Sequence, residues 1–469
     1  MITHSVSSKE IRAVSLRLDS SYHLSTGNSS RRAVLSSPYG ITNIGEYTDR
    51  VFYGNRARRI YVKKKESGVP FLSSSEILKA DFNSVKLVSK LYTPNIEELA
   101  LEYGWTLITR SGTVGKTAYC TNVHAGKLSS DHVIRVVPNG KMKGGCLYCF
   151  LSSKYGYSLL TQGMFGAVIQ SIEPKYIEGL PIPVFPDGLQ ESVDSLMQEA
   201  ARLREEASME LNEAQTILME KSQLPTLTID DYDFYGLPVK DRKLSTFVRN
   251  KRNITTLSIN AFNYSERIAN LKKKITCNTI ALEDAIEGGD FFSTGSFPRV
   301  EVKPEYGIML INQSDIFDEI IRGKHISKRG VKTDNLVEYG EVMIAGVGTL
   351  GENETFCRTI FANEDLVGQL VSGEFIRMKS NGIIPSGYIY TWLNSEYGFR
   401  LIRHTQAGTK LCRPIQKMLL KQPIPVIEQE SMDKIDSLVR SAHTKRFEAN
   451  KNELLAIRMV EQEIEKWNK

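Results

Sequence analysis

The stretch "RSGTVGKTAYC" (Arg110–Cys120) holds residue types that can bind phosphate, since Gly-Lys-Thr ends the loop that cradles phosphates in many nucleotide enzymes. That loop also needs a glycine five residues before its last glycine, where this sequence has Arg110. The residues after Lys116 predict a second strand, so no helix N-terminus is available to stabilise an anion. The spacing therefore indicates a glycine turn between two strands rather than a nucleotide-binding loop.

Cysteine side chains offer a second chemistry, metal binding. Cys146 and Cys149 form one C-x-x-C pair, and a zinc site would need two further ligands. The candidates nearby in the sequence are Cys120, His124 and His132. The alternative is that these thiols are simply buried.

Groups for other reactions are missing or isolated. The sequence has no Pro-Pro pair, so it lacks the Asn/Asp-Pro-Pro-aromatic loop of amino-methyltransferases. No glycine-rich motif follows a strand and opens a helix, which argues against a dinucleotide or S-adenosylmethionine fold. His132 and His325 could act as general bases, but their positions favour a polar surface or DNA-facing role, and no catalytic triad is evident. We expect neither a catalytic site nor a metal site.

Length and composition limit the number of domains and the cellular location of the protein. A chain of 469 residues predicts two or more domains, and 41% hydrophobic residues suffice for their cores. No apolar run reaches the roughly 18 residues of a membrane span, and "MITHSVSSKEIRAV" lacks the apolar stretch of a signal peptide. Six irregularly spaced cysteines indicate free thiols in a reducing compartment. These features predict a cytoplasmic protein.

The chain is internally duplicated. "EYGWTLITRSGTVG" (Glu102–Gly115) matches "EYGEVMIAGVGTLG" (Glu338–Gly351), 236 residues later. "SSKYGYSLL" (Ser152–Leu160) matches "NSEYGFRLI" (Asn394–Ile402), and "PIPV" also recurs, both 242 residues later. Because the order is kept and the offset drifts by only a few residues, we infer duplication with small loop insertions.

The duplication bears on both candidate sites. Gly-Thr-Val/Leu-Gly persists in the second copy, but Lys116 is replaced there by Glu352. The C-x-x-C positions are occupied in the second copy by Tyr388 and Thr391. The turn is therefore the shared feature, whereas Lys116 belongs to one copy, where it either contacts phosphate or points into solvent.

Each copy ends in a long polar helix with an apolar seam. Small or apolar residues recur every seven positions in the first helix, and the same phase recurs 242 residues later. The predicted pairing residues are Val193, Ala200, Ala207 and Ala214 in the first helix and Ile435, Ala442, Ala449 and Ala456 in the second. Seven-residue spacing is the coiled-coil period, and small residues let helices approach closely. We expect the helices to pair with each other; two separate surface helices are the alternative.

Basic residues concentrate in the two globular parts. The net charge is +10 over 1–186 and +6 over 234–426, but −9 over 187–233 and −1 over 427–469. Basic loop-rich domains are typical of nucleic-acid binding, although such runs also occur as plain solvated surface. The candidate DNA-binding residues are Arg56, Arg58, Arg59, Arg110, Lys116, Lys324, Lys328 and Arg329. The acidic first helix should face protein rather than DNA.

Together these features resemble the specificity (S) subunit of type I restriction-modification systems. The first copy opens with "SLRLDSSYH" (Ser15–His23), both copies carry the glycine turn, and they close with "EGLPIPVFP" and "KQPIPV" before their helices. The resemblance covers nearly the whole chain. It departs in the second copy, where "INAFNY" stands in place of "RLDSSY".

The resemblance implies an α+β fold with two tandem α/β target recognition domains. Two long helices separate these domains and pair as an antiparallel coiled coil, with a pseudo-two-fold from the duplication. The implied division is a first recognition domain at 1–186, a central helix at 187–225, a second recognition domain at 226–426 and a C-terminal helix at 427–469.

The resemblance also implies a function. Such subunits are not enzymes: each recognition domain reads one half of a bipartite, asymmetric site in double-stranded DNA, and the helices dock two modification (methyltransferase) subunits. Restriction (endonuclease/translocase) subunits join that complex. The chain itself then binds no cofactor and no membrane, while S-adenosylmethionine, ATP and Mg²⁺ belong to the partner subunits. The alternatives are a specificity subunit of a methylation-only or other phage-defence complex, a coiled-coil protein scaffold, and a nucleotide-binding enzyme.

Overall fold

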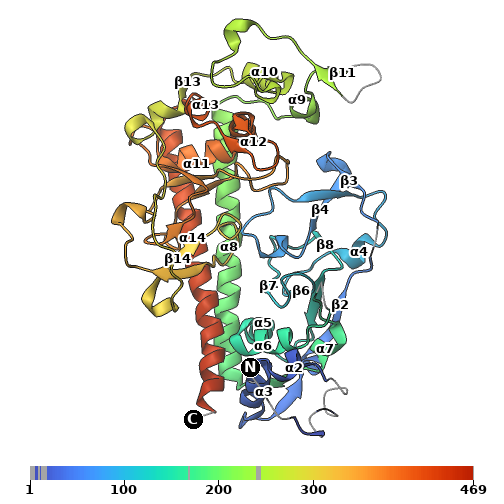
Figure 1. The fold of residues 1–469 in the computed structure, drawn as a ribbon. Coiled ribbons are helices and arrows are strands. Elements are labelled where there is room, and N and C mark those ends of the chain that lie inside the picture. Colours follow the sequence, from blue (N-terminus) through green and yellow to red (C-terminus); the bar gives the residue numbers. More distant parts are fainter. Residues whose placement is uncertain are drawn as a thin grey trace. The chain divides into compact units, whose positions relative to one another are not determined.

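The computed structural model describes residues 6–8, 11, 18–56, 58–166, 170–238 and 244–467, so Ser15–Arg17 of the opening motif lie outside the described residues. The chain divides into two compact units. Unit 1 comprises Met1–Glu205 with Glu448–Lys469, and unit 2 comprises Glu206–Phe447. Each unit has an α/β part and one stretch of each of two long helices, α8 (Asp187–Lys221) and α14 (Gln429–Lys466), drawn in green and red in Figure 1.

Two small sheets form the centre of unit 1. One has the strand order β2-β9-β6-β7 and is antiparallel; the other has the order β3-β5-β4-β8, in which β4 and β8 run parallel. The strands are β2 (Thr48–Tyr53), β3 (Tyr61–Val62), β4 (Gly68–Leu72), β5 (Lys86–Ser89), β6 (Thr106–Thr109), β7 (Thr117–Tyr119), β8 (Leu128–Ser129) and β9 (Val133–Pro138). In β6, Leu107 and Ile108 belong to different hydrophobic clusters, so both faces of this central strand are buried.

Helices and a short strand pair complete unit 1. The helices are α2 (Ser20–His23), α3 (Gly27–Leu35), α4 (Ile96–Leu99), α5 (Gly144–Ser152), α6 (Lys154–Gln162) and α7 (Pro174–Glu178). The "PIP" segment forms β10 (Pro181–Pro183), which pairs antiparallel with β1 (Ile41–Asn43) immediately before α8 begins. The duplicated proline motif therefore ends each α/β part on a fixed strand.

Unit 2 repeats this plan. Its sheets have the orders β15-β14-β18 and β19-β16-β17, which correspond to β5-β4-β8 and β9-β6-β7 of unit 1. The strands are β14 (Gly307–Ile311), β15 (Lys324–Ser327), β16 (Val342–Ala345), β17 (Thr359–Phe361), β18 (Leu370–Val371) and β19 (Phe375–Met378), and β13 (Thr279–Ala281) pairs with β22 (Pro423–Pro425). The helices are α9 (Ile229–Asp233), α10 (Glu266–Lys274), α11 (Ser386–Asn394), α12 (Glu396–His404) and α13 (Gln416–Leu420), and two small hairpins are β11 (Leu237–Pro238) with β12 (Ser245–Thr246) and β20 (Gln406–Ala407) with β21 (Arg413–Pro414).

The motif shared by "SSKYGYSLL" and "NSEYGFRLI" has a physical cause in both units. The hydroxyl oxygens of Ser153 and Ser395 cap α6 and α12 by accepting hydrogen bonds from Gly156 N and Gly398 N, at 3.1 and 3.0 Å. A Cβ on either glycine would lie 2.1 Å from a carbonyl oxygen of the preceding helix. Serine caps the helix and glycine permits the close packing, so both recur.

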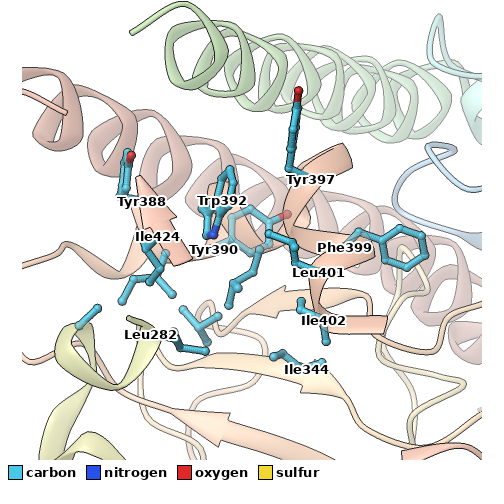
Figure 2. Packing of buried hydrophobic residues seen from close by; sticks show 14 of the residues in the cluster. Leu282, Ile344, Tyr388, Tyr390, Trp392, Tyr397, Phe399, Leu401, Ile402 and Ile424 are labelled. Atoms are coloured by element: carbon cyan, nitrogen blue, oxygen red, sulfur yellow. The ribbon is translucent and has the colours of Figure 1, made fainter. Parts of the chain in front are cut away.

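The hydrophobic core of unit 2 lies between its sheets and its helices. Tyr388 and Trp392 of α11, Leu401 and Ile402 of α12 and Ile344 of β16 belong to one hydrophobic cluster, in which Figure 2 shows Ile402 beside Ile344. The Trp392 indole N–H donates to Pro423 O at 2.8 Å, so this large side chain is both buried and satisfied. Unit 1 has an equivalent core around α5 and α6.

The two long helices are antiparallel within each unit, as predicted. In unit 1 the beginning of α8 packs on the end of α14, since Val193 and Ala456 share one hydrophobic cluster. In unit 2 the end of α8 packs on the beginning of α14, since Ala214 and Ile435 share another. No helix among the described residues has the length and apolarity needed to cross a membrane. All six cysteines are free thiols, as predicted.

Candidate nucleic-acid interface

The first basic cluster of unit 1 lies in the loop between β2 and β3. The side chains of Arg56 and Arg58 are exposed and have no hydrogen-bond or ion-pair partner among the described residues. Arg59 differs, because its Nη2 lies 2.5 Å from the buried Asp131 carboxylate and its guanidinium lies 4.9 Å from the Phe71 ring centre. Two of the three predicted arginines are therefore available to a ligand, and Arg59 fixes the loop.

A small hollow joins this loop to the one that follows β5. Arg58 and Arg59 line it together with Thr93 of the second loop. Lys90 and Tyr92 of that second loop are exposed. The two loops thus form a single corner of unit 1 that carries basic and aromatic side chains, the combination that contacts phosphates and bases.

The basic cluster of unit 2 lies at the equivalent corner. Lys328 and Arg329 are exposed in the loop after β15, whereas Lys324 forms an ion pair with Glu301. The Ser327 N–H donates to Val300 O at 2.8 Å. The loop after β15 therefore lies against the segment that precedes β14, as the loop after β5 meets the β2–β3 loop in unit 1.

Sequence reasoning missed several members of these corners. Lys86 lies 5.5 Å from the ring centre of the exposed Tyr61 in unit 1, and Arg299 is exposed in unit 2. Lys90 could have been found from the duplication, because it precedes Lys328 by 238 residues, the offset that relates β5 to β15. Arg299 could not be found in this way, because it is a single arginine outside any cluster of basic residues.

The glycine turn of unit 1 connects two antiparallel strands, β6 and β7, as predicted. Gly115 has φ +86°, a left-handed conformation that favours glycine. Arg110 donates from Nη2 to Glu173 Oε1 at 2.6 Å and lies over the Tyr53 ring, and Lys116 is partly exposed. Arg110 is thus held by an ion pair, and the structure does not bring either residue to the basic corner lined by Arg58.

All eight predicted pairing residues have 0% exposed surface: Val193, Ala200, Ala207, Ala214, Ile435, Ala442, Ala449 and Ala456. Ala200 shares a small cluster with Leu203 and Ala449, so the two helix backbones approach closely there. Val193 clusters with Ala456, Ala200 with Ala449, and Ala214 with Ile435. The partner on α14 therefore moves back by seven residues for every seven residues forward on α8.

Polar contacts that the sequence pattern did not predict also fix this register. In unit 1, Arg204 Nη1 lies 2.6 Å from Glu453 Oε2, and Arg204 Nη2 donates to Asn450 Oδ1 at 2.9 Å. The Tyr148 hydroxyl donates to the same Glu453 at 2.5 Å, which ties α5 to the helix pair. In unit 2, Lys445 lies 2.7 Å from Glu210. A buried ion pair such as Arg204–Glu453 favours one register of a helix pair over its neighbours.

A buried arginine occupies the same strand position in both units. Arg135 of β9 donates to three backbone carbonyls, those of Val133, Leu99 and Ser129. Burial lowers its pKa to about 10, so it stays charged at neutral pH. Arg377 of β19 instead forms a two-point pair with Glu341, its Nη2 lying 2.8 Å from Oε1 and its Nε 2.9 Å from Oε2.

The candidate metal and base residues remain isolated. No group of three or more histidine, cysteine, aspartate or glutamate side chains that could hold a metal ion occurs among the described residues. Cys146 and Cys149 are buried, and burial raises the pKa of the Cys146 thiol to about 12. His132 lies beside Asp131 at 3.9 Å, and His325 lies on β15 opposite Met309.

Two similar α/β units, each built onto a stretch of an antiparallel helix pair, define the architecture of this chain. It resembles S subunits of type I restriction-modification systems, as expected. One similar structure is the S subunit from M. genitalium, with 10% identity, a TM-score of 0.35 and coverage of 92% of this chain and 96% of that one. A second is the HsdS subunit from Thermoanaerobacter tengcongensis, with 12% identity, a TM-score of 0.28 and coverage of 92% and 96%.

A third similar structure is described as showing the complex assembly and conformational transition of the type I R-M system, with 13% identity, a TM-score of 0.29 and coverage of 91% and 97%. No family model matches the sequence. No curated protein matches it either.

Proposed function

We propose that this chain is the non-catalytic DNA-recognition subunit of a type I restriction-modification complex. The observation that carries the proposal is the duplicated plan, in which two α/β units share strand order and capping motifs and each packs on an antiparallel helix pair. Two similar recognition units in one chain suit a DNA target that consists of two half-sites, one for each unit. Because the loops of the two units differ, the half-sites differ too, and the target is asymmetric.

The basic corners hold the DNA backbone in this proposal. Arg56 and Arg58 of unit 1 and Lys328 and Arg329 of unit 2 are exposed and without side-chain partners among the described residues. Contacts of this kind position a protein on DNA without reading sequence. Base reading then falls to neighbouring polar and aromatic side chains on the same loops.

The helix pair docks the modification subunits. Segment 187–233 carries a net charge of −9, which disfavours contact with phosphates and leaves an acidic surface for protein. Two copies of a methyltransferase subunit, one for each unit, match the duplication. S-adenosylmethionine, ATP and Mg²⁺ serve those partners and the restriction subunits, not this chain.

Mapping methylated adenines at single-molecule level tests the proposal. The chain would be expressed in cells with the modification subunits of its own system, and an empty vector would supply the background. We expect modification of one asymmetric motif with two short specified parts separated by unspecified base pairs. A continuous motif, a palindromic motif, or modification that persists without this chain would contradict the proposal.

A further inference from the structure

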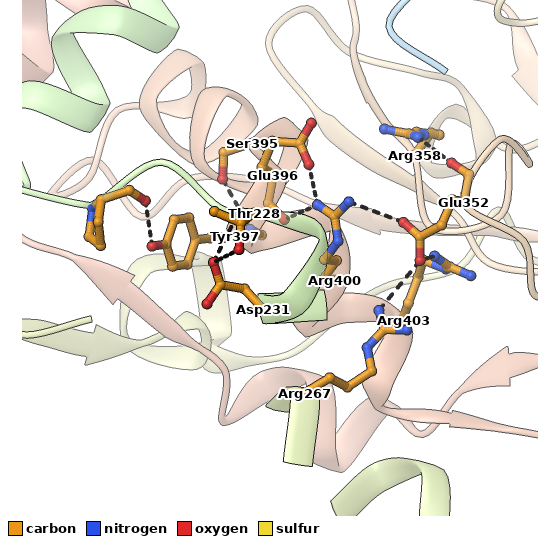
Figure 3. A network of polar contacts seen from close by, with 12 residues as sticks. Thr228, Asp231, Arg267, Glu352, Arg358, Ser395, Glu396, Tyr397, Arg400 and Arg403 are labelled. Atoms are coloured by element: carbon orange, nitrogen blue, oxygen red, sulfur yellow. Dashed lines mark hydrogen bonds and ion pairs between the residues drawn. The ribbon is translucent and has the colours of Figure 1, made fainter. Parts of the chain in front are cut away.

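Glu352 of unit 2 is surrounded by arginines. Its carboxylate lies 2.8 Å from Arg403 Nη1, 3.2 Å from Arg400 Nη2 and 3.5 Å from Arg267 Nη2. Figure 3 shows these side chains converging on it, Arg400 and Arg403 from α12 and Arg267 from α10, while Arg358 Nη2 donates to the Glu352 carbonyl oxygen at 2.9 Å. One side chain on the glycine turn thus faces three guanidinium groups.

The arginines are buried, whereas the glutamate is only partly buried. Arg267, Arg400 and Arg403 are 1%, 5% and 2% exposed, whereas the Glu352 side chain is 37% exposed. Aromatic rings hold the guanidinium groups in place: Arg400 lies 3.9 Å from the Tyr232 ring centre, and Arg403 lies 4.9 Å from that of Phe399. The site is therefore a fixed cationic floor covered by one partly exposed glutamate.

Three buried arginines share one carboxylate. Glu352 forms ion pairs with Arg267, Arg400 and Arg403, and Arg400 also pairs with Glu396. Several buried atoms lack hydrogen-bond partners among the described residues: the donors Nε and Nη2 of Arg267, Nε of Arg400 and Nε of Arg403, and one acceptor, Oε2 of Glu352. Buried donors without partners are unfavourable unless an anion engages them.

Unit 1 shows that the fold does not require this cluster. The residue equivalent to Glu352 is Lys116, and those equivalent to Arg400 and Arg403 are Ser158 and Thr161. The same turn packs on the same helix there, since a Cβ on Gly115 would lie 3.1 Å from the Thr161 methyl group. The arginines are thus an addition to unit 2.

We propose that Arg267, Arg400 and Arg403 form a phosphate-binding site in which the Glu352 carboxylate occupies the place of the phosphate. A phosphate group that displaces Glu352 can make two-point contacts with the Nε and Nη2 edges of Arg267 and Arg400, which hold unused donors, and a further contact with Arg403 Nη1. The ligand is a backbone phosphate of DNA, and this assignment rests on the proposed function. Glu352 then acts as a gate that keeps the site closed to weak anions.

Binding of inorganic phosphate to Glu352→Gln tests the site without DNA. Glutamine keeps the shape but removes the competing charge, so we expect phosphate to bind on the order of tenfold more tightly than to the unsubstituted chain. The measurement is isothermal titration with phosphate against chloride at equal ionic strength. The matched control is Glu338→Gln, which removes the same charge from an ion pair with Lys379 on the same unit. Equal phosphate binding by the unsubstituted chain and Glu352→Gln would overturn the site.

A milder variant guards against loss of folding. Glu352→Asp keeps the charge, and its shorter side chain withdraws the carboxylate from the arginines, so its phosphate affinity should lie between those of the other two chains. If Glu352→Gln does not fold and Glu352→Asp binds phosphate no better than the unsubstituted chain, the proposal fails.

Duplex DNA distinguishes the two sources of phosphate. Glu352→Gln should strengthen DNA binding regardless of sequence and steepen the dependence of log K on log salt by about 0.9 for one added contact. If Glu352→Gln binds inorganic phosphate more tightly but its slope of log K against log salt for DNA binding is unchanged, the assignment of the ligand as a DNA phosphate is overturned. If no chain binds DNA at all, the proposed function fails while phosphate binding by Glu352→Gln still supports the anion site.

Discussion

At the scale of single residues, the difference between Arg58 and Arg59 decides what each can do. Both are arginines in one basic run, but Arg59 is paired with Asp131 and Arg58 has no partner among the described residues. Substituting Arg58 with alanine should weaken binding to all duplexes and flatten the slope of log K against log salt by about 0.9.

Arg202→Ala on α8 is the control and should leave the slope unchanged, because Arg202 pairs with Glu199 on the acidic helix, away from the basic corner. Fluorescence anisotropy with one duplex over a range of salt concentrations measures both variants. An unchanged slope for Arg58→Ala would contradict the phosphate contact.

These pairings explain why the sequence predicted the clusters but not their members. The partners of Arg59, Arg110 and Lys324 are Asp131, Glu173 and Glu301, which lie between 23 and 72 residues away. Charge clustering is a local signal, whereas ion pairs form between segments that only the fold brings together. The same limit hid Glu352, whose partners come from α10 and α12.

His404 predicts acid sensitivity of unit 2. Burial and then the nearby charge of Lys272 lower its pKa to about 3, from an ordinary value near 6.5. The unfolded chain therefore binds a proton below pH 6.5 that the folded chain does not, and stability falls as the pH drops. From pH 7 to 5 the loss from this residue is about 2 kcal/mol.

Urea unfolding at pH 7 and pH 5 measures this effect. His404→Asn should be less stable at pH 7 but lose less on acidification. Gln422→Ala removes the hydrogen-bond partner of the imidazole, 3.1 Å away, and should keep the pH dependence because the titrating group remains. Identical pH dependence in His404→Asn and the unsubstituted chain would contradict the assignment.

The Arg377–Glu341 pair predicts a large energetic difference between two glutamates three residues apart. Arg377 and Glu341 are 0% and 1% exposed, so Glu341→Gln leaves a buried arginine without its counter-charge, at a cost of about 3–5 kcal/mol. Glu338→Gln removes an ion pair with Lys379 that is largely exposed and should cost no more than about 1 kcal/mol. Hydrogen exchange of the β16 and β19 amides compares the two variants, and protection should fall much further in Glu341→Gln than in Glu338→Gln. Equal protection in both variants would contradict the prediction.

At the scale of elements, the seam of the helix pair was predictable because it is periodic. Seven-residue spacing is written into consecutive turns of one helix, so the buried face of α8 follows from the positions of Val193, Ala200, Ala207 and Ala214. The polar contacts of Arg204 with Glu453 and Asn450 do not alter the seven-residue spacing of apolar residues, so that spacing could not predict them. They were visible only in the structure.

Leucine at the seam should separate the helices. Ala200 and Ala442 are fully buried at positions of close approach, so Ala200→Leu with Ala442→Leu should destabilise the pair by about 1–3 kcal/mol for each site. We expect loss of the complex with the modification subunits in gel filtration. Met209→Leu, at an exposed position of α8, is the control and should leave assembly intact. Unchanged assembly of the double variant would contradict the role of the pair.

The strands were predictable where a motif recurred. The glycine turn, the serine-capped helix and the proline strand appear in both units because each meets a steric or capping need. The charges placed on this shared plan are free to differ, as Lys116 and Glu352 do. Duplication therefore reveals the fold more readily than the binding residues.

At the scale of the whole molecule, the helix pair is proposed to set the spacing between the two half-sites. α8 has 35 residues, so at about 1.5 Å per residue it is roughly 50 Å long. DNA advances about 3.4 Å per base pair along each strand, so this length limits the distance between half-site centres to about 15 base pairs. A spacing near one helical turn presents both half-sites on one face of the duplex.

Lengthening both helices tests this role. Three extra heptads after Glu205 and after Phe447, where the two units divide, add 21 residues or about 31 Å to each helix, close to one further turn of DNA. We expect the unspecified gap in the methylated motif to grow by about 9 base pairs while both half-site sequences stay the same. The control has one extra heptad in each helix, which adds about 10 Å, or about 3 base pairs. Three base pairs rotate the second half-site around the duplex axis by more than a quarter of a turn. The second unit would then no longer face its half-site, and we expect this control to lose modification. An unchanged gap in the longer protein, measured by mapping methylated adenines, would show that the helices do not act as the spacer.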